Sequence, residues 1–96
     1  MFTKSAKLTF YLQQSQSLKD KRQVRRSIIA KTRHKFNVSA AEIATQENHK
    51  MLTIGVATVS GEIAHLENSL DEIIRYMASN ADAELTDVVI FDGLET

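Results

Sequence analysis

The stretch SLKDKRQVRRSIIAKTRHKFNV, residues 17–38, predicts a long helix and decides the layout of the fold. Ser17 is a good N-cap residue, and Asp20 three residues later can complete a capping box and favour the positive end of the helix dipole. At about 100° per residue, the side chains suited to burial fall on one broad face, which we expect to pack on a core. They are Leu18, Val24, Ile28, Ile29, Thr32 and Phe36.

Two cations break this pattern, because Lys21 and Arg25 fall on the same face near its start. Long basic side chains can pack their stems on apolar surface while their charged heads reach outward. We therefore expect both residues to lie where the helix overhangs the sheet, with their heads in solvent or against a carboxylate.

Charge is unevenly distributed along the chain, although the formal net charge is zero. Residues 1–50 carry eleven Lys and Arg but three acids, whereas residues 51–96 carry one Arg and nine acids. One interpretation is that the two halves neutralise each other in the fold. The other is a basic face for an anionic partner. The predicted helix supplies such a face as a stripe on its solvent side, formed by Lys19, Arg22, Arg26 and Arg33.

Hydrophobic alternation predicts four strands, at residues 5–14, 37–46, 51–60 and 84–92. In the second of them, we expect Ala41 and Ile43 to face inward and Glu42 to face outward. Gly55, inside the third, suggests that another backbone or side chain approaches closely.

A second amphipathic helix is expected between the last two strands, capped by Ser60 and running through residues 78–82. Its apolar stripe consists of Ile63, Leu66, Leu70, Ile73, Ile74 and Met77. Its opposite face is acidic, which suits a surface turned to solvent.

The resulting order is β-α-β-β-α-β, with two crossovers and one hairpin. Right-handed crossovers then give a single α+β domain over residues 1–96 with the ferredoxin-like arrangement. This arrangement is a four-stranded antiparallel sheet with both helices on one face. Strands one and three are expected in the centre of the sheet, and strands two and four at its edges.

Composition excludes several classes of protein. The chain has no Cys, which excludes disulfides, thiolate zinc sites and cysteine catalysis, and this fits the cytoplasm. No apolar run approaches the roughly 20 residues of a membrane span, and the first residues lack a signal-peptide pattern. We therefore expect a cytoplasmic protein with no membrane partner.

Motifs for catalysis or cofactor binding are not found in the sequence. The three histidines are not spaced as a metal site, there is no nucleophile elbow, and the three glycines are too scattered for a phosphate loop. We expect no catalytic residue, no metal and no cofactor.

Nucleic acid remains a candidate partner, but not through the face used by ferredoxin-like RNA-recognition domains. Those domains stack bases on aromatic residues of strands one and three, and here residues 51–60 contain none, while strand one offers Tyr11. Any RNA contact is therefore expected from the helical stripe to phosphates, without sequence-specific recognition of DNA.

The sheet face away from the helices suggests a second kind of partner. Val88, Val89, Ile90 and Phe91 follow one another, so both faces of the last strand are apolar. An exposed apolar patch usually marks an interface. We expect a homodimer through Tyr11, Ala57, Val59, Val89 and Phe91.

Three segments resemble the YlxP-like family of bacterial domains of unknown function. They are SLKDKR (Ser17–Arg22), FNVSAAEI (Phe36–Ile43) and IGVATVS (Ile54–Ser60), which are similar to that family's helix opening and two strand motifs. The resemblance implies a ferredoxin-like fold and no established catalytic residue. Its members often lie near genes for translation initiation and ribosome maturation. Arg25 and Thr32 depart from the family pattern, which is often aliphatic at these positions.

These observations lead to a small non-catalytic binding module, associated with RNA or a ribosomal subunit through the helix at 17–36. The alternatives are a dimeric regulatory domain that binds a small ligand, and a module for protein assembly alone. The ligand sensors of this topology commonly carry a Gly in the loop after strand one, and the acylphosphatase type of enzyme needs an Arg there. The sequence QQSQS at residues 13–17 has neither.

Overall fold

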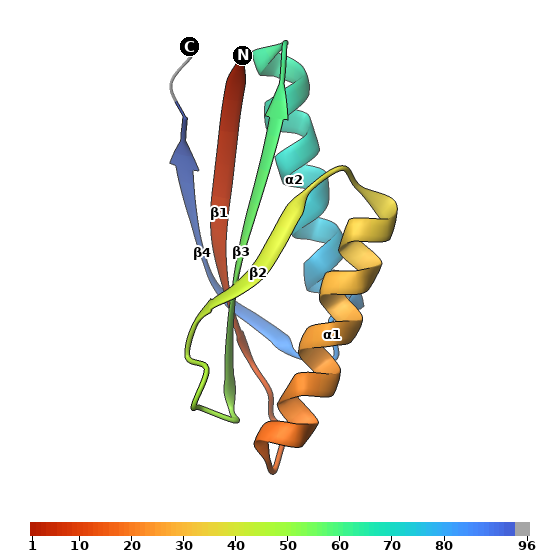
Figure 1. Ribbon diagram of the computed structural model, residues 1–96, viewed down its shortest axis with the longest axis vertical. Helices are drawn as coiled ribbons and strands as arrows, with labels where there is room; N and C mark the ends of the chain where they lie inside the picture. Colours follow the sequence, from red (N-terminus) through yellow and green to blue (C-terminus); the bar gives the residue numbers. More distant parts are fainter. Residues whose placement is uncertain (94–96) are drawn as a thin grey trace.

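The computed structural model describes residues 1–93 and has the element order that the sequence predicts. The elements are β1 (Phe2–Tyr11), α1 (Leu18–Lys35), β2 (Ser39–Ala44), β3 (Met51–Ser60), α2 (Ile63–Asn80) and β4 (Glu84–Asp92). Both helices lie against one face of a twisted sheet, and the other face is left uncovered (Figure 1). The ferredoxin-like α+β fold is thereby confirmed.

The sheet has the strand order β2-β3-β1-β4, and every neighbouring pair is antiparallel. β1 and β3 are central, as expected, and Leu8 of β1 pairs with Ile54 on one side and Val88 on the other. A bulge after Thr9 shifts the register with β4, so Phe10 pairs with Leu85. Because β1 is central, it joins the β2–β3 pair on one side to β4 on the other.

The core lies between the sheet and the helices and is built from alternate strand positions and the two helix stripes. Its buried members include Ala6, Leu8, Phe10, Leu12, Ile28, Leu52, Ile54, Val56, Leu70, Ile73 and Met77. Val24 and Ile29 of α1, and Phe36 at its C-cap, are partly buried against it. Thr32 is fully buried, and its hydroxyl donates to the carbonyl of Ile28 at 2.7 Å. That bond explains how a polar residue fits a position where an aliphatic one is expected.

The two helices begin differently. The Ser17 hydroxyl accepts a hydrogen bond from the Asp20 N–H at 3.1 Å, so the predicted N-cap of α1 is confirmed. The Asp20 carboxylate accepts from the Gln16 N–H at 2.9 Å rather than from the N–H of Ser17, as a capping box requires. α2 begins later than expected, because the Ser60 hydroxyl binds the N–H of Glu62 in a local turn. Glu62 is its N-cap, without a side-chain bond.

The orientation predicted for β2 is wrong, because the side chains of Ala41, Glu42 and Ile43 each face the side of the sheet opposite to the predicted one. Glu42 points toward α1 and is buried, whereas Ala41 is exposed and Ile43 is 50% exposed on the uncovered face. Ile43 lies over Gly55 of β3, where an added Cβ atom would come within 2.9 Å of the Ile43 Cγ2 atom. The close approach expected at Gly55 is therefore present, and Ile43 is the side chain that makes it.

Candidate functional site

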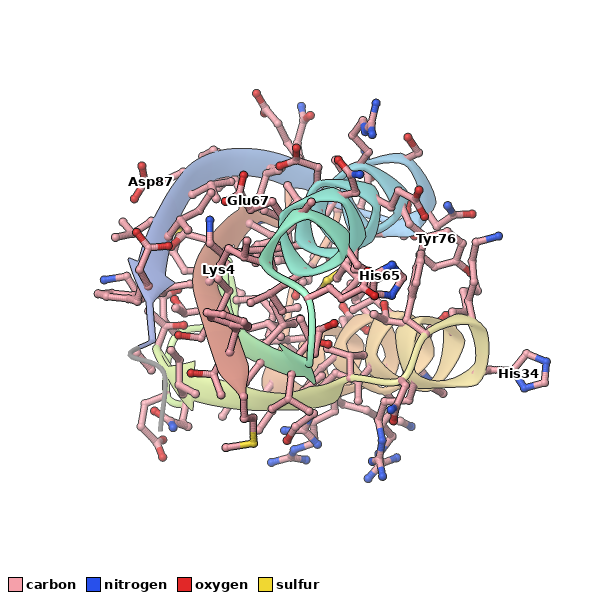
Figure 2. All side chains as sticks on the ribbon, turned by 90° about the horizontal axis from the view of Figure 1, so that it is seen from above. Lys4, His34, His65, Glu67, Tyr76 and Asp87 are labelled. Atoms are coloured by element: carbon pink, nitrogen blue, oxygen red, sulfur yellow. The ribbon has the colours of Figure 1, made fainter. Side chains whose placement is uncertain are left out.

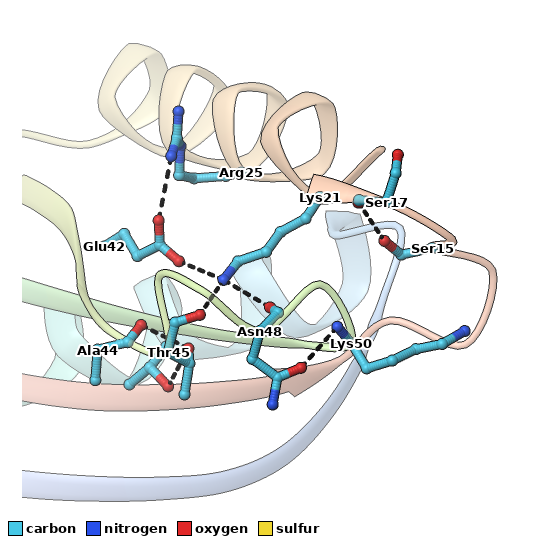
Figure 3. Close-up of polar contacts among 10 residues, drawn as sticks. Ser15, Ser17, Lys21, Arg25, Glu42, Ala44, Thr45, Asn48 and Lys50 are labelled. Atoms are coloured by element: carbon cyan, nitrogen blue, oxygen red, sulfur yellow. Dashed lines mark hydrogen bonds and ion pairs between the residues drawn. The ribbon is translucent and has the colours of Figure 1, made fainter. Parts of the chain in front are cut away.

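A buried cluster of charges fastens the start of α1 to β2 (Figure 3). The Lys21 ammonium lies 2.7 Å from Oε2 of Glu42, and their side chains are 2% and 7% exposed. The guanidinium of Arg25 donates to Oε1 of the same carboxylate at 3.1 Å. One acid therefore holds two cations, and each of its oxygens has a charged partner.

The same ammonium also holds the turn between β2 and β3. It donates to the carbonyl oxygens of Thr45 and Asn48, the second at 2.9 Å. Thr45 has a φ of 61°, a left-handed conformation that is uncommon for a β-branched residue. The lysine thus ties a strained turn to the helix with two hydrogen bonds, in addition to its ion pair with Glu42.

The prediction for this pair of cations is therefore confirmed in part. Both heads meet a carboxylate, but Lys21 does not overhang into solvent and is instead enclosed. Because this cluster is closed and its charges are satisfied, we assign it a structural role, which is to fix the rotation of α1 on the sheet.

The four stripe residues predicted on α1 are all exposed, namely Lys19, Arg22, Arg26 and Arg33. At 100° per residue they lie roughly 60–120° further round the helix than Arg25, on the flank beside β2. Arg33 lines a hollow of about 470 Å³ together with residues from the start of β2 and the end of β3. The stripe therefore runs beside the β2 edge of the sheet.

Ion pairs do not neutralise this stripe within residues 1–93. In that part of the chain, the ion pairs of α1 join Lys21 and Arg25 to Glu42, and none joins α1 to the acidic helix α2. The helices meet instead through an edge-on contact of Phe36 with Tyr76, whose ring centroids are 5.5 Å apart, with Lys35 over both rings. Tyr76 points from α2 toward α1 in Figure 2.

The uncovered sheet face brings together all five residues that the sequence assigned to an interface. Tyr11 is 37% exposed, Val59 57%, Val89 36% and Phe91 52%, and Ala57 is also exposed. Their register places them on the sides of β1, β3 and β4 opposite to the core residues. Ile43 joins this set, although its apolar character in the sequence predicts burial.

A third region is a hollow of about 370 Å³ where the β1–α1 loop meets the end of α2. It is lined by Leu12, Gln14, Ser15, Asp20, Gln23, Val24, Ser27 and Asp82. Its lining residues include two carboxylates but no Lys, Arg or His, so it does not suit an anionic ligand.

The histidines of the helices do not converge. Figure 2 shows His34 projecting from α1 away from the rest of the molecule, while His65 lies on α2. In the part of the chain that the structure describes, no group of three His, Asp or Glu residues could hold a metal ion. No helix among the described residues is long and apolar enough to cross a lipid bilayer.

Comparison with known proteins places the chain in a family. A family model described as "Protein of unknown function (DUF503)" matches residues 4–90. The chain belongs to this family. It is also 34% identical over 70 residues to the uncharacterized protein YlxP of Bacillus subtilis (strain 168), a match that covers 73% of this chain and 76% of YlxP.

The buried cluster brings two of the sequence motifs together. The buried pair joins Lys21, from the SLKDKR segment, to Glu42, from the FNVSAAEI segment. Both segments were noted as family motifs without any sign that they meet in space. Their contact could have been predicted from two features of the sequence. A Lys lies on the apolar face of the helix, and the strand that follows contains a single acid with which that Lys can pair.

Proposed function

We propose that this DUF503 protein is a non-catalytic binding module that takes the phosphate backbone of structured RNA on the flank of α1. The observation that carries the proposal is the stripe of Lys19, Arg22, Arg26 and Arg33, exposed and without an acidic partner within residues 1–93. Cations in a row along a rigid helix suit a phosphate backbone, which presents charges at regular intervals.

The rotation of α1 supports this use of the stripe. Lys21 and Arg25 are held by Glu42, so the helix cannot turn to bury the stripe without breaking a buried ion pair. A preorganised row of cations loses less conformational freedom on binding than a mobile one.

The proposal includes no reading of bases. β3 has no aromatic residue, and the exposed aromatic rings on the uncovered sheet face are Tyr11 and Phe91, which lie toward opposite ends of that face. Without a stacking platform, we expect weak sequence preference, and contacts limited to phosphates and sugars.

The test is the salt dependence of affinity for a structured RNA hairpin, measured by fluorescence anisotropy. With about three or four phosphate contacts, the plot of log affinity against log salt should have a slope of roughly −2 to −4. Arg22→Ala and Arg26→Ala should each reduce the magnitude of that slope by about one unit.

A matched control is Arg75→Ala, which removes an exposed Arg from α2 rather than α1. Its slope should equal that of the unmodified protein. Loss of binding by the control to the same extent as by Arg22→Ala would reject the stripe as the site, and no binding at low salt would reject the function. Co-sedimentation with ribosomal subunits at low and moderate salt then tests whether the RNA is ribosomal.

The second candidate function is a regulatory domain for a small ligand, favoured by the hollow between the β1–α1 loop and α2. Asp20 and Asp82 in its lining suit a ligand that carries a positive charge or several N–H donors. This function predicts a rise in melting temperature with a cationic metabolite, abolished by Asp82→Ala, and no affinity for RNA.

A further inference from the structure

The uncovered sheet face has features that the proposed function does not use. It carries six exposed residues of apolar character that belong to all four strands: Tyr11, Ile43, Ala57, Val59, Val89 and Phe91. Exposed apolar side chains gathered on one sheet face usually mark an interaction surface. A surface of this composition favours a protein partner over a nucleic acid, which would need cations.

The shape of the face is complementary to itself. A hollow of about 320 Å³ lies over small residues, which include Ser5, Ala41, Gly55 and Ala57. Ile43 and Phe91 line the same hollow, and they are 50% and 52% exposed. The face therefore offers both projecting side chains and a recess for one.

The charges of the face are complementary to each other as well. Lys7 of β1 pairs with Val89 in the register, and Asp87 of β4 pairs with Thr9, so both charges stand on the uncovered side. Figure 2 shows Asp87 directed away from both helices. Neither makes an ion pair in the described part of the chain, although they are one cation and one anion on adjacent strands.

We propose that a second copy of this chain covers the face, related to the first by a two-fold axis. A two-fold interface uses the same patch on both copies, so it requires a patch that complements itself. In this arrangement Phe91 of each copy enters the recess of the other. Lys7 of each copy then faces Asp87 of the other, which gives two ion pairs.

The size of the face approaches that of a standard dimer interface. Strands of six to ten residues, about 4.8 Å apart and rising about 3.3 Å per residue, span roughly 550 Å² in projection before side-chain relief is counted. A standard interface buries about 800 Å² per partner. Because α1 lies on the opposite layer, the dimer leaves Lys19, Arg22 and Arg26 exposed, whereas Arg33 borders the interface through the hollow it shares with Ala57 and Val59. The inference does not depend on RNA binding.

The first test is the mass of the unmodified protein in solution, measured by size-exclusion chromatography with light scattering at micromolar concentration. We expect twice the chain mass of 10.8 kDa. A monomer under these conditions would overturn the proposal.

A pair of neighbouring substitutions then tests the face. Phe91→Glu places a charge in the interface and should give a folded monomer. Ile90→Glu is the matched control, because Ile90 is 47% exposed but lies on the helix side of β4, beside Val88 and Ile74. It should stay a dimer. A dimer that survives Phe91→Glu would contradict the proposal, and Val59→Glu replaces that variant if it fails to fold.

Charge reversal tests the two-fold arrangement itself. Lys7→Glu and Asp87→Lys should each weaken the dimer by at least tenfold, since each variant sets like charges opposite one another. Combining them restores opposite charges across the interface and should recover most of the affinity. A double variant as weak as the single ones would reject the pairing of Lys7 with Asp87.

Discussion

Helix α1 carries two sets of cations that have opposite environments. Lys21 and Arg25 face the sheet and share Glu42, and Lys21 is 2% exposed. Lys19, Arg22, Arg26 and Arg33 lie one flank away, exposed and without an acid in the described chain. Two of them, Arg22 and Arg26, are sequence neighbours of the buried set.

This difference shows that residue type says little about the role of a charge, whereas helical position says much. The inner cations bind a partner within the chain and specify how helix and strand meet. The outer cations make no ion pair within the described chain, which leaves them available for an anionic partner. Removing the inner cations' partner should change the stability of the fold, whereas removing the outer cations should change the binding of an anionic partner.

The largest expected effect is on the free energy of unfolding when the shared acid is removed. Glu42→Leu leaves the Lys21 ammonium buried without a counter-charge, which should destabilise the fold by about 3–5 kcal/mol. Urea unfolding followed by circular dichroism measures this directly.

The matched control for that variant replaces both partners, Lys21→Met together with Glu42→Leu. With no unpaired ammonium left, stability should recover most of the loss. A remainder of about 1–2 kcal/mol is expected, because Lys21→Met also removes the hydrogen bonds to the Thr45 and Asn48 carbonyls. A double variant that is as unstable as Glu42→Leu alone would show that packing, rather than the unpaired charge, causes the loss.

A smaller effect is expected from the outer member of the buried cluster. Arg25→Leu removes a guanidinium whose side chain is 29% exposed, while Lys21 stays paired with Glu42. The cost should be at most about 1 kcal/mol, the range of partly exposed pairs. If this variant proves as destabilising as Glu42→Leu, then Arg25 rather than Lys21 is the main partner of the acid.

The smallest effect on stability is expected from the stripe. Arg22→Ala and Arg26→Ala should leave the urea midpoint unchanged within error, because both side chains are exposed and neither makes a hydrogen bond or ion pair within residues 1–93. A clear drop in the midpoint would mean that the stripe contributes to the stability of the fold. Any loss of RNA affinity in these variants would then have to be corrected for the fraction of unfolded protein.

Much of the fold could be predicted from local patterns. The bounds of β3 and β4 agree with the alternation in MLTIGVATVS and ELTDVVIFD, because each strand has one continuous pattern and a polar boundary. β1 begins earlier than predicted, at Phe2, and ends at Tyr11, while Leu12 is buried just beyond the strand. Its alternation gave the correct faces, although it could not fix where pairing with β3 and β4 ends.

The orientation of β2 could not be predicted in the same way. In the sequence SAAEIA, the larger apolar side chain is Ile43, and hydrophobicity alone turns it toward the core. Glu42 takes the inward position because Lys21 and Arg25, about twenty residues earlier in the chain, place two positive charges on that side of the strand. That interaction links distant parts of the chain and leaves no trace in the periodicity of either segment.

The candidate sites were predicted to different degrees. The stripe followed from helical spacing, since exposed positions need no partner to be identified. The open-face set was also correct in orientation for β1, β3 and β4, but it lacked Ile43 as a consequence of the β2 error. The roles assigned to Lys7 and Asp87 needed the register of β1 with β4, which the sequence does not contain.

The central position of β1 has a consequence for the order in which the chain can fold. During synthesis this strand emerges before either of its neighbours, yet it pairs along its length with β3 and, through Lys4 and Asp92, with the far end of β4. Pairings this distant close slowly, and until they form the apolar side of β1 has no sheet around it. The helices can form from local interactions, whereas the pairing of β1 with β3 and β4 is completed last.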